Sequence, residues 1–213
     1  MKVLSKGIKF LQINGVFFFS VRFFSKCFNF LFNLASFHRI DIDIDHSAKV
    51  KGLKYIEIGS NFHAGKQLWL EAVVDYYGQR FSPLIRIGNN VSFQDFVHIG
   101  ATNYVEIGDN VLFASKVYVS DHNHGIYDGD YQSNPQEPPR FRQLTSNKEV
   151  KIEENVWIGD AVTILPGVHI GKGSIIGANS VVAKDIPEFS IAVGVPAKVI
   201  KKYDVTIDRW VSL

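Results

Sequence analysis

The chain has 213 residues, 46% of them apolar and 21% charged, so it is long enough to bury a core and lacks the composition of a disordered protein. Its formal net charge of +2 argues against a dedicated nucleic-acid-binding protein. The single cysteine, Cys27, excludes an intramolecular disulfide framework and a zinc site built from cysteines, and it fits a reducing compartment.

The first 40 residues differ in composition from the rest of the chain. They hold ten of the 17 phenylalanines and carry a charge of +6, whereas the remaining 173 residues carry −4. The spacing of Phe17, Phe24 and Phe28 is helical, Phe10 extends this stripe backwards, and Gly15 favours a break. The pattern therefore predicts one or two amphipathic helices within an N-terminal segment, residues 1–45.

This N-terminal segment is open to two interpretations. Its longest uninterrupted apolar run, residues 16–19, is too short for a membrane span or for the core of a signal peptide. In the first interpretation the phenylalanines pack on the body of a cytoplasmic enzyme or on a partner subunit. In the second they lie on the inner membrane surface, where lysine and arginine side chains meet anionic lipids. We prefer the first.

A period of six residues runs through the body of the chain, residues 46–186. It predicts short strands joined by tight corners, a β-solenoid in which one aliphatic side chain per hexad points inward. Glycine and asparagine recur at the expected corners, where the backbone adopts positive φ. The inward positions form four sets: Ile58, Ala64 and Leu70; Ile87, Phe93 and Ile99; Ile107, Phe113 and Val119; and Ile152, Ile158, Ile164, Ile170, Ile176 and Val182.

The repeat is interrupted by an inserted loop, residues 120–149. An insertion of this length in a repeat domain is typically functional, and this one begins with two histidines, His122 and His124. An imidazole, with a pKa of about 6.5, is suited to removing a proton from an attacking hydroxyl group. Asp121 is a candidate to orient that imidazole, but neighbouring side chains on an extended chain point to opposite sides, which disfavours this role.

The hexads stop after Pro187, and residues 187–213 form a C-terminal extension. Residues 196–202 begin with a proline and predict a short helix, and the stretch around Trp210 predicts a second one. We expect these two helices to cap the open end of the solenoid, which otherwise exposes unpaired strand edges.

Several segments of the repeat resemble the hexapeptide-repeat acyltransferases, namely residues 155–159, 164–168, 176–182 and 194–198. Within that family, residues 120–125 are most similar to bacterial O-acetyltransferases of surface polysaccharides. The resemblance covers roughly residues 50–203. It implies a mainly β fold, a left-handed parallel β-helix, with acetyl-CoA as the acetyl donor and no metal. It also implies a homotrimer with active sites between subunits.

The resemblance also implies roles for individual residues. His122 is the expected base, with His124 as the second candidate, and Trp157 is expected to form a wall of the site. Gln94 and Asp95 are candidates to contact the acceptor from a neighbouring coil, with solvated surface as the alternative. The positions expected to bind coenzyme A are Asp160, Ala178, Ala183, Lys184, Lys198 and Lys201.

The predicted function is transfer of an acetyl group from acetyl-CoA to a sugar hydroxyl of a bacterial surface polysaccharide, such as O-antigen, exopolysaccharide or capsule including polysialic acid. One alternative is a small-molecule O-acetyltransferase that acts on a free sugar, an oligosaccharide or an antibiotic. A second, from a different class, is a β-solenoid zinc carbonic anhydrase with His98, His122 and His124 as ligands. A third is a non-catalytic scaffold.

Overall fold

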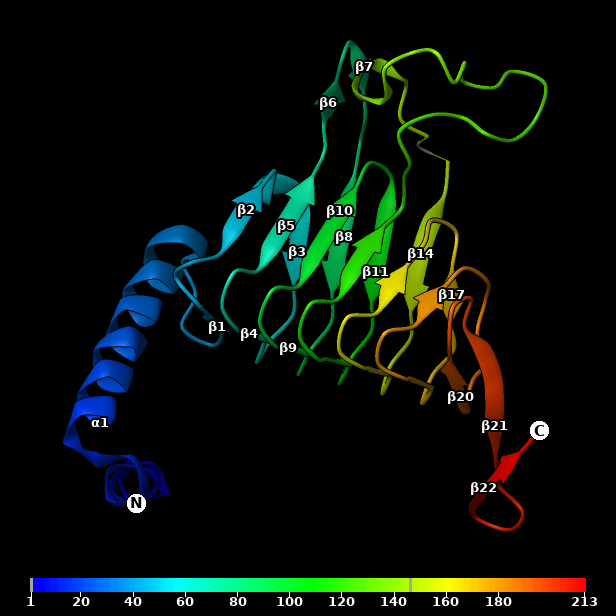
Figure 1. The fold of residues 1–213 in the computed structure, drawn as a ribbon. Helices are drawn as coiled ribbons and strands as arrows, with labels where there is room; N and C mark the ends of the chain where they lie inside the picture. Colours follow the sequence, from blue (N-terminus) through cyan, green and yellow to red (C-terminus); the bar gives the residue numbers. More distant parts are fainter. Residues whose placement is uncertain (1, 146) are drawn as a thin grey trace.

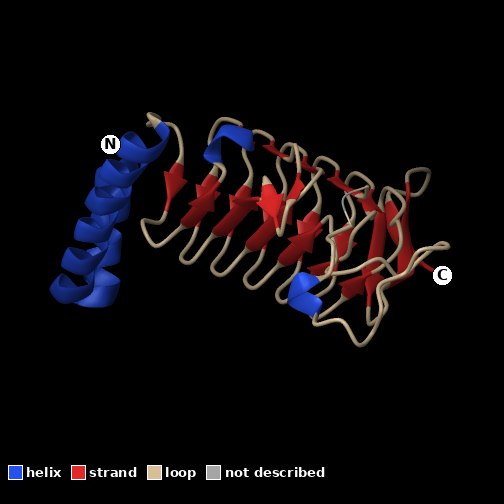
Figure 2. Ribbon diagram, turned by 90° about the horizontal axis from the view of Figure 1, so that it is seen from above, coloured by secondary structure: helices blue, strands red, loops and turns tan. Residues whose placement is uncertain are grey.

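Three parallel sheets wind around one narrow core in the computed structural model, which describes residues 2–145 and 147–213 (Figures 1 and 2). The side chains of residues 2–11 and 14 are outside that description, so the predicted place of Phe10 in the helical stripe lies outside the described residues. A helix, α1 (Lys2–Phe37), lies at the N-terminal end of the coil, and strands close the other end.

Each sheet contributes one side of the coil. Sheet A contains β1 (Asp43–Ile44), β4 (His63–Ala64), β9 (Ser92–Phe93), β12 (Leu112–Phe113), β15 (Trp157–Ile158), β18 (Ile175–Ile176) and β20 (Ser190–Val193). Sheet B contains β2 (Lys49–Lys51), β5 (Trp69–Ala72), β10 (His98–Ala101), β13 (Tyr118–Ser120), β16 (Thr163–Ile164) and β19 (Val181–Val182). Sheet C contains β3 (Ile56–Ile58), β8 (Leu84–Ile87), β11 (Tyr104–Ile107), β14 (Glu149–Ile152) and β17 (His169–Ile170), and a short helical turn, η1 (Leu53–Tyr55), precedes β3.

The chain passes from sheet A to sheet B to sheet C and then begins the next coil, so a full coil needs three hexads. Strands of successive coils pair in parallel and in the register that the hexads predict: Phe93 lies beside Phe113, and Phe113 beside Ile158. The predicted period of six is thereby confirmed as a parallel β-helix. Its first strand, β1, begins before residue 46, within the range assigned to the N-terminal segment.

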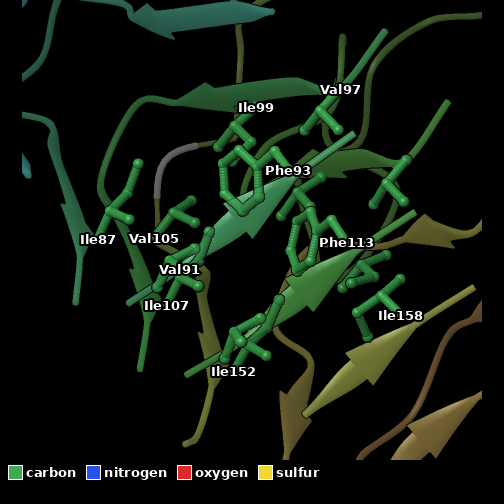
Figure 3. Packing of buried hydrophobic residues seen from close by; sticks show 14 of the residues in the cluster. Ile87, Val91, Phe93, Val97, Ile99, Val105, Ile107, Phe113, Ile152 and Ile158 are labelled. Atoms are coloured by element: carbon green, nitrogen blue, oxygen red, sulfur yellow. The ribbon is translucent and has the colours of Figure 1, made fainter. Parts of the chain in front are cut away.

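The core is filled by the inward positions of the hexads. All six members of the longest set, from Ile152 to Val182, are fully buried. Phe93 and Phe113 are also fully buried and stack on one another with ring centroids 4.6 Å apart (Figure 3). Phe62 packs edge-on against Phe93 at 5.1 Å. The aromatic rings thus fill the core of the early coils, and smaller aliphatic side chains fill the later ones.

One corner of the coil, between sheets C and A, carries a ladder of asparagines. Asn61, Asn90, Asn110 and Asn155 each have φ between 56° and 60°, as predicted for these corners. Their side-chain amides hydrogen-bond from coil to coil at 3.1 to 3.2 Å. Asparagine tolerates the left-handed conformation better than most residues, and here it also links adjacent coils.

The N-terminal helix α1 is kinked where the sequence predicts a break. Gly15 has φ 78° and ψ 169° and separates two helical stretches. The second stretch, Gly15–Phe37, has 23 residues and a mean hydropathy of 1.3, so by length and composition it could cross a membrane. The sequence-based expectation was that this segment is too short in apolar residues to span a membrane. The two differ because isolated polar residues shorten the apolar runs but lower the mean hydropathy of the helix only a little.

Two asparagines of α1 complete the exposed edge of the first coil. Asn33 Nδ2 donates to the carbonyl oxygen of Ile44 at 2.9 Å, and the Ile44 N–H donates to Asn33 Oδ1 at 3.2 Å. One turn earlier, Asn29 Oδ1 accepts from the His46 N–H at 3.0 Å. Both asparagines are buried, and their amides occupy the place that a preceding strand would take.

Replacing Asn33 with alanine is expected to lower the free energy of unfolding by about 1–3 kcal/mol. The substitution leaves the N–H and the carbonyl of Ile44 buried without partners, and a buried unsatisfied polar group costs about that much. Thermal and urea denaturation measure the effect. Gln12→Ala, at an exposed position of the same helix, is the control and should change stability little. Equal stability of Asn33→Ala and the unmodified protein would contradict the capping role.

Asp43, on β1, gives this end of the protein a defined acid sensitivity. A hydrogen bond from His63 and the nearby Lys26 of α1 outweigh the opposing effect of burial and lower the pKa of Asp43 to about 2. An unfolded aspartate has a pKa of about 3.9, so the stabilisation is present above about pH 4 and is lost as the pH falls towards 2.

We expect Asp43→Asn to lower stability near neutral pH by about 1 kcal/mol or less, since the carboxylate is partly exposed and solvent screens its contacts. Near pH 2 the variant and the unmodified protein should be equally stable. Urea denaturation across the acidic range measures the difference, with Asp130→Asn in the exposed loop as control. A difference that does not depend on pH would argue against this linkage.

The C-terminal extension is not helical, and the prediction of a helical cap is wrong. Residues 198–204 form β21 (Lys198–Asp204), which pairs antiparallel with β20, and β22 (Arg209–Ser212) pairs with β21. Side chains along β21 alternate between exposed and half-buried, as expected for a strand. The β-branched and aromatic residues of this segment favour strands, and pairing with the free edge of β20 stabilises them.

Candidate active site

The inserted loop leaves the coil at the corner between sheets B and C, after β13 and before β14. Apart from a short turn, η2 (Pro139–Phe141), it has no helix or strand among its described residues. A hairpin of β6 (Asp75–Tyr76) and β7 (Gln79–Arg80) leaves the same corner two coils earlier. Figure 1 shows the hairpin and the loop rising side by side beyond the coils. The hairpin was not predicted from the sequence.

The hairpin binds the loop through three of its residues. The Tyr76 hydroxyl donates to the carbonyl of Arg140 at 2.6 Å, and Arg140 Nη2 donates to the Tyr77 hydroxyl at 2.7 Å. The Gln79 amide exchanges two hydrogen bonds with the backbone of Leu144, at 2.7 and 3.2 Å. The hairpin therefore holds the loop in place beside the histidines that begin it. These residues lie 63 to 65 positions from their partners in the sequence, and only a register break between Leu70 and Ile87 indicated an insertion there.

His122 lies at the base of the loop and is oriented by Asp121. Its Nδ1 is 2.8 Å from Asp121 Oδ1. Asp121 is fully buried and also accepts hydrogen bonds from the backbone N–H groups of Thr102 and Asn103, at 2.8 to 3.0 Å. The sequence argument against this contact assumed extended chain, but the backbone bends at Asp121, so both side chains reach the same side.

The contact with Asp121 determines which nitrogen of His122 is available for chemistry. With the carboxylate accepting from Nδ1–H, the lone pair of the imidazole is on Nε2. The ring packs over Gly100, where an added Cβ would lie 3.4 Å from Cε1, and the side chain is 14% exposed. A partly buried, oriented imidazole with one free nitrogen is the arrangement of a general base.

His124 points to a different set of partners. Its Nδ1 is 3.2 Å from the Tyr76 hydroxyl, and the two rings meet edge to face with centroids 5.2 Å apart. The backbone of His124 also forms a bridge with Leu144. His124 is thus part of the contact between hairpin and loop, within two residues of His122, and it lines the same corner.

Trp157 lies elsewhere in the chain. It begins β15 in sheet A, is 49% exposed and stands beside Leu112 of the preceding coil. In a three-sided coil, the corner between sheets B and C lies opposite sheet A. One chain therefore does not bring Trp157 and His122 together.

The predicted coenzyme A residues divide into three groups. Ala183 and Lys184 follow β19 at the corner of His122, and Ala183 is two rungs from Ser120, roughly 10 Å along the stack. Asp160 and Ala178 lie at the corner between sheets A and B, on the other edge of sheet B. Lys198 and Lys201 lie on β21, beyond the coils.

Gln94 and Asp95 also lie at the corner between sheets A and B. Asp95 Oδ1 accepts from the Lys66 N–H at 2.8 Å, and Asp160 Oδ1 accepts from the Ser115 N–H at the same distance. These two aspartates each link one coil to its neighbour, which is a structural role. Within one chain neither they nor Gln94 reach the corner of His122.

The three histidines of the zinc alternative have other neighbours. Over residues 2–145 and 147–213, no three histidine, cysteine, aspartate or glutamate side chains form a group that could hold a metal ion. His98 stacks on Trp69 with ring centroids 4.2 Å apart, and its burial there, more than the nearby positive groups, lowers its pKa. His122 and His124 are engaged by Asp121 and Tyr76 as described above.

Comparison with known proteins gives relatives of one kind. The profile of the family described as bacterial transferase hexapeptide (six repeats) matches residues 149–184. WbbJ of Escherichia coli K12, assigned as a lipopolysaccharide biosynthesis O-acetyl transferase, is 44% identical over 156 residues, which are 73% of this chain and 76% of that protein. The galactoside O-acetyltransferase of the same organism is 38% identical, with 65% of this chain matching 62% of that protein.

Solved structures agree with the fold. AntD, an N-acyltransferase from Bacillus cereus solved with dTDP-4-amino-4,6-dideoxyglucose and coenzyme A, superposes with a TM-score of 0.62 at 24% identity, covering 78% of this chain and 83% of that one. A hexapeptide-repeat acetyltransferase from Vibrio cholerae gives a TM-score of 0.52 at 27% identity, covering 70% and 74%.

Proposed function

This chain belongs to the hexapeptide-repeat transferases and is an acetyltransferase, and we propose that it acetylates a hydroxyl group of a sugar in a bacterial surface polysaccharide. The observation that carries the proposal is His122, oriented by a buried carboxylate at the one corner where hairpin and loop build a wall. The similarity to WbbJ supports a lipopolysaccharide sugar as acceptor.

In the proposed reaction, acetyl-CoA supplies the acetyl group as a thioester and leaves as the free thiol. His122 Nε2 accepts the proton of the sugar hydroxyl as its oxygen attacks the thioester carbonyl. The carboxylate of Asp121 stabilises the imidazolium that forms. His122 then returns the proton to the departing sulfur, so the base is regenerated and atoms and charge balance.

Acetyl-CoA is proposed to lie along the corner between sheets B and C, from His122 towards the C-terminal end of the solenoid. Ala183 is exposed and small, so an extended thiol arm can approach the backbone there, and Lys184 follows it with a positive charge for a phosphate. Lys198 and Lys201 remain proposals for the phosphate end. The left-handed winding of the coil is likewise proposed from the family.

We also propose a homotrimer with active sites between subunits. Five of the predicted site residues lie on sheet A or at its corner with sheet B, away from His122. They are Trp157, Asp160, Ala178, Gln94 and Asp95. These residues join His122 in one site only if a second copy places that side against the corner between sheets B and C. The division of the predicted residues between two sides of the coil supports this arrangement.

Release of free thiol from acetyl-CoA tests the proposed function. We expect release with lipopolysaccharide O-antigen or a capsular polysaccharide, including polysialic acid, and much less with small galactosides. The galactoside O-acetyltransferase relative makes the small acceptor the second candidate, and release with galactosides alone would favour it. No release with any of these acceptors would contradict the proposal.

A further inference from the structure

The second stretch of α1, Gly15–Phe37, has the reverse of the usual polarity for a surface helix. The residues that it turns towards the solenoid include four polar ones, with Asn29 and Asn33 buried and Ser25 and Ser36 half-buried. Near the end of the helix, Phe32 and Phe37 also pack against the core. Most of its apolar side chains are exposed and face away from the protein. A surface helix in a soluble monomer ordinarily does the opposite.

The outward apolar face is large and nearly uninterrupted. We define it by its exposed side chains, which are Val16, Phe17, Val21, Phe23, Phe24, Phe28, Phe30, Leu31 and Leu34. Phe17, Phe24 and Leu31 form its centre line at intervals of seven and are 72%, 61% and 58% exposed. At about 100° per residue, the face covers roughly half of the helix circumference. Exposed apolar surfaces of this size mark a binding surface for a protein or a membrane.

We propose that this outward apolar face inserts into the surface of an anionic lipid bilayer, with the helix in the plane of the membrane and the solenoid outside it. The charge of the segment favours a bilayer as the partner. Residues 1–40 carry +6 and no acidic residue. Lys26 and Arg39 pair with aspartates of the first coil, and the helical backbone preceding Gly15 carries Lys2, Lys6 and Lys9 at intervals of four and three. Basic residues near an anionic leaflet strengthen binding to it.

The contacts with the first coil require an in-plane helix instead of a membrane span. Lys26, Asn29 and Asn33 bind coil one, so the helix from Lys26 onwards must stay beside the solenoid. Within the second stretch, only Gly15 to Ser25 is then free to leave the protein. These 11 residues extend about 16 Å, whereas the hydrocarbon core is about 30 Å thick.

The width of the apolar face also favours lipid over a second copy of this chain. A helix that packs against one other helix buries a narrow stripe and keeps a solvated side. Here the solenoid occupies the polar side, so pairing with a single helix would leave much of the apolar face in water. A bilayer covers the whole face at once.

Vesicle flotation tests the proposal with the full chain. The protein should float with vesicles of phosphatidylethanolamine and phosphatidylglycerol, and less with phosphatidylcholine alone. The triple variant Phe17→Ser, Phe24→Ser, Leu31→Ser should bind at least about tenfold more weakly, because it removes three large apolar side chains from the contact with the bilayer. All three positions are exposed, so the fold should be retained.

The matched control is Val205→Ser, Ile207→Ser, which removes exposed apolar surface at the opposite end of the solenoid. It should float as the unmodified protein does. Cys27, the single cysteine, is exposed on the apolar side of α1 and carries a polarity-sensitive fluorophore for a second measurement. Its emission should shift to the blue when anionic vesicles are added.

Two results would overturn the proposal. One is the absence of flotation and of any fluorescence shift on adding vesicles. The other is a change in oligomeric state of the triple variant by light scattering, without vesicle binding by the unmodified protein, which would assign the face to contacts between copies. Thiol release measured with a water-soluble acceptor is independent of both, so failure here is distinct from failure of the proposed reaction.

Discussion

Replacing His122 with alanine is expected to lower kcat for acetyl transfer by about 10²- to 10⁴-fold, the range that a positioned general base contributes. The variant removes the free Nε2 from the corner beside the loop and leaves Asp121 with its bonds to Thr102 and Asn103. Because the base acts on the reacting proton, KM for acetyl-CoA should change little. Initial rates of thiol release over a range of acetyl-CoA concentrations separate the two constants.

His63→Ala is the matched control, because His63 also contacts a carboxylate, Asp43, but lies on β4 of sheet A, away from the loop. It should retain the activity of the unmodified protein. His124→Ala distinguishes the two candidate bases. Near-normal turnover in His122→Ala with loss in His124→Ala would assign the base to His124.

Asp121→Asn is expected to lower kcat by about a hundredfold or more with little change in KM. An amide at this position disturbs the tautomer and orientation of His122, and it cannot stabilise an imidazolium as a carboxylate does. Asp121 is a positioning residue, since it acts through His122. The double variant Asp121→Asn, His122→Ala should therefore be no slower than His122→Ala alone.

A structural effect must be separated from this one, because Asp121 also binds the backbone of the neighbouring coil. Asp109→Asn serves as the comparison. Asp109 accepts a hydrogen bond from the Asn89 N–H at 2.7 Å at another corner of the coil, and this contact involves no histidine. It should lower stability in thermal denaturation without lowering kcat. If both variants lose kcat in proportion to their loss of stability, the positioning role is contradicted.

The fold could be predicted in detail where the sequence is periodic. Each hexad forms one of the three sides of the coil. The spacing of Ile152, Ile158 and Ile164 therefore predicts where each strand lies, where the chain turns, and how strands of successive coils pair. The C-terminal extension has no such period. Its proline and lysines suggested a helix locally, whereas the unpaired edge of β20 favoured a strand, and an edge contact of that kind is not visible in local sequence.

The part of the site that could be predicted from the sequence is the part that lies where the repeat is interrupted. His122 and His124 stand at the start of the inserted loop, which the broken hexads located. Tyr76 could not be found in this way, because it reaches His124 from 48 residues away through an unpredicted hairpin. The contact between Asp121 and His122 was missed for a local reason, a bend that follows β13.

The number of coils in the solenoid fixes the distance between α1 and the active site. In sheet B, three steps separate the first strand, β2, from β13, which ends next to His122. At about 4.8 Å per step, His122 stands about 14 Å from the first coil. If α1 lies on a membrane, the number of coils between α1 and His122 sets the distance from the membrane at which a sugar of an anchored glycan is acetylated. No feature of the site itself changes that distance. A homologue with one more coil would reach a sugar farther along the same chain by the same chemistry.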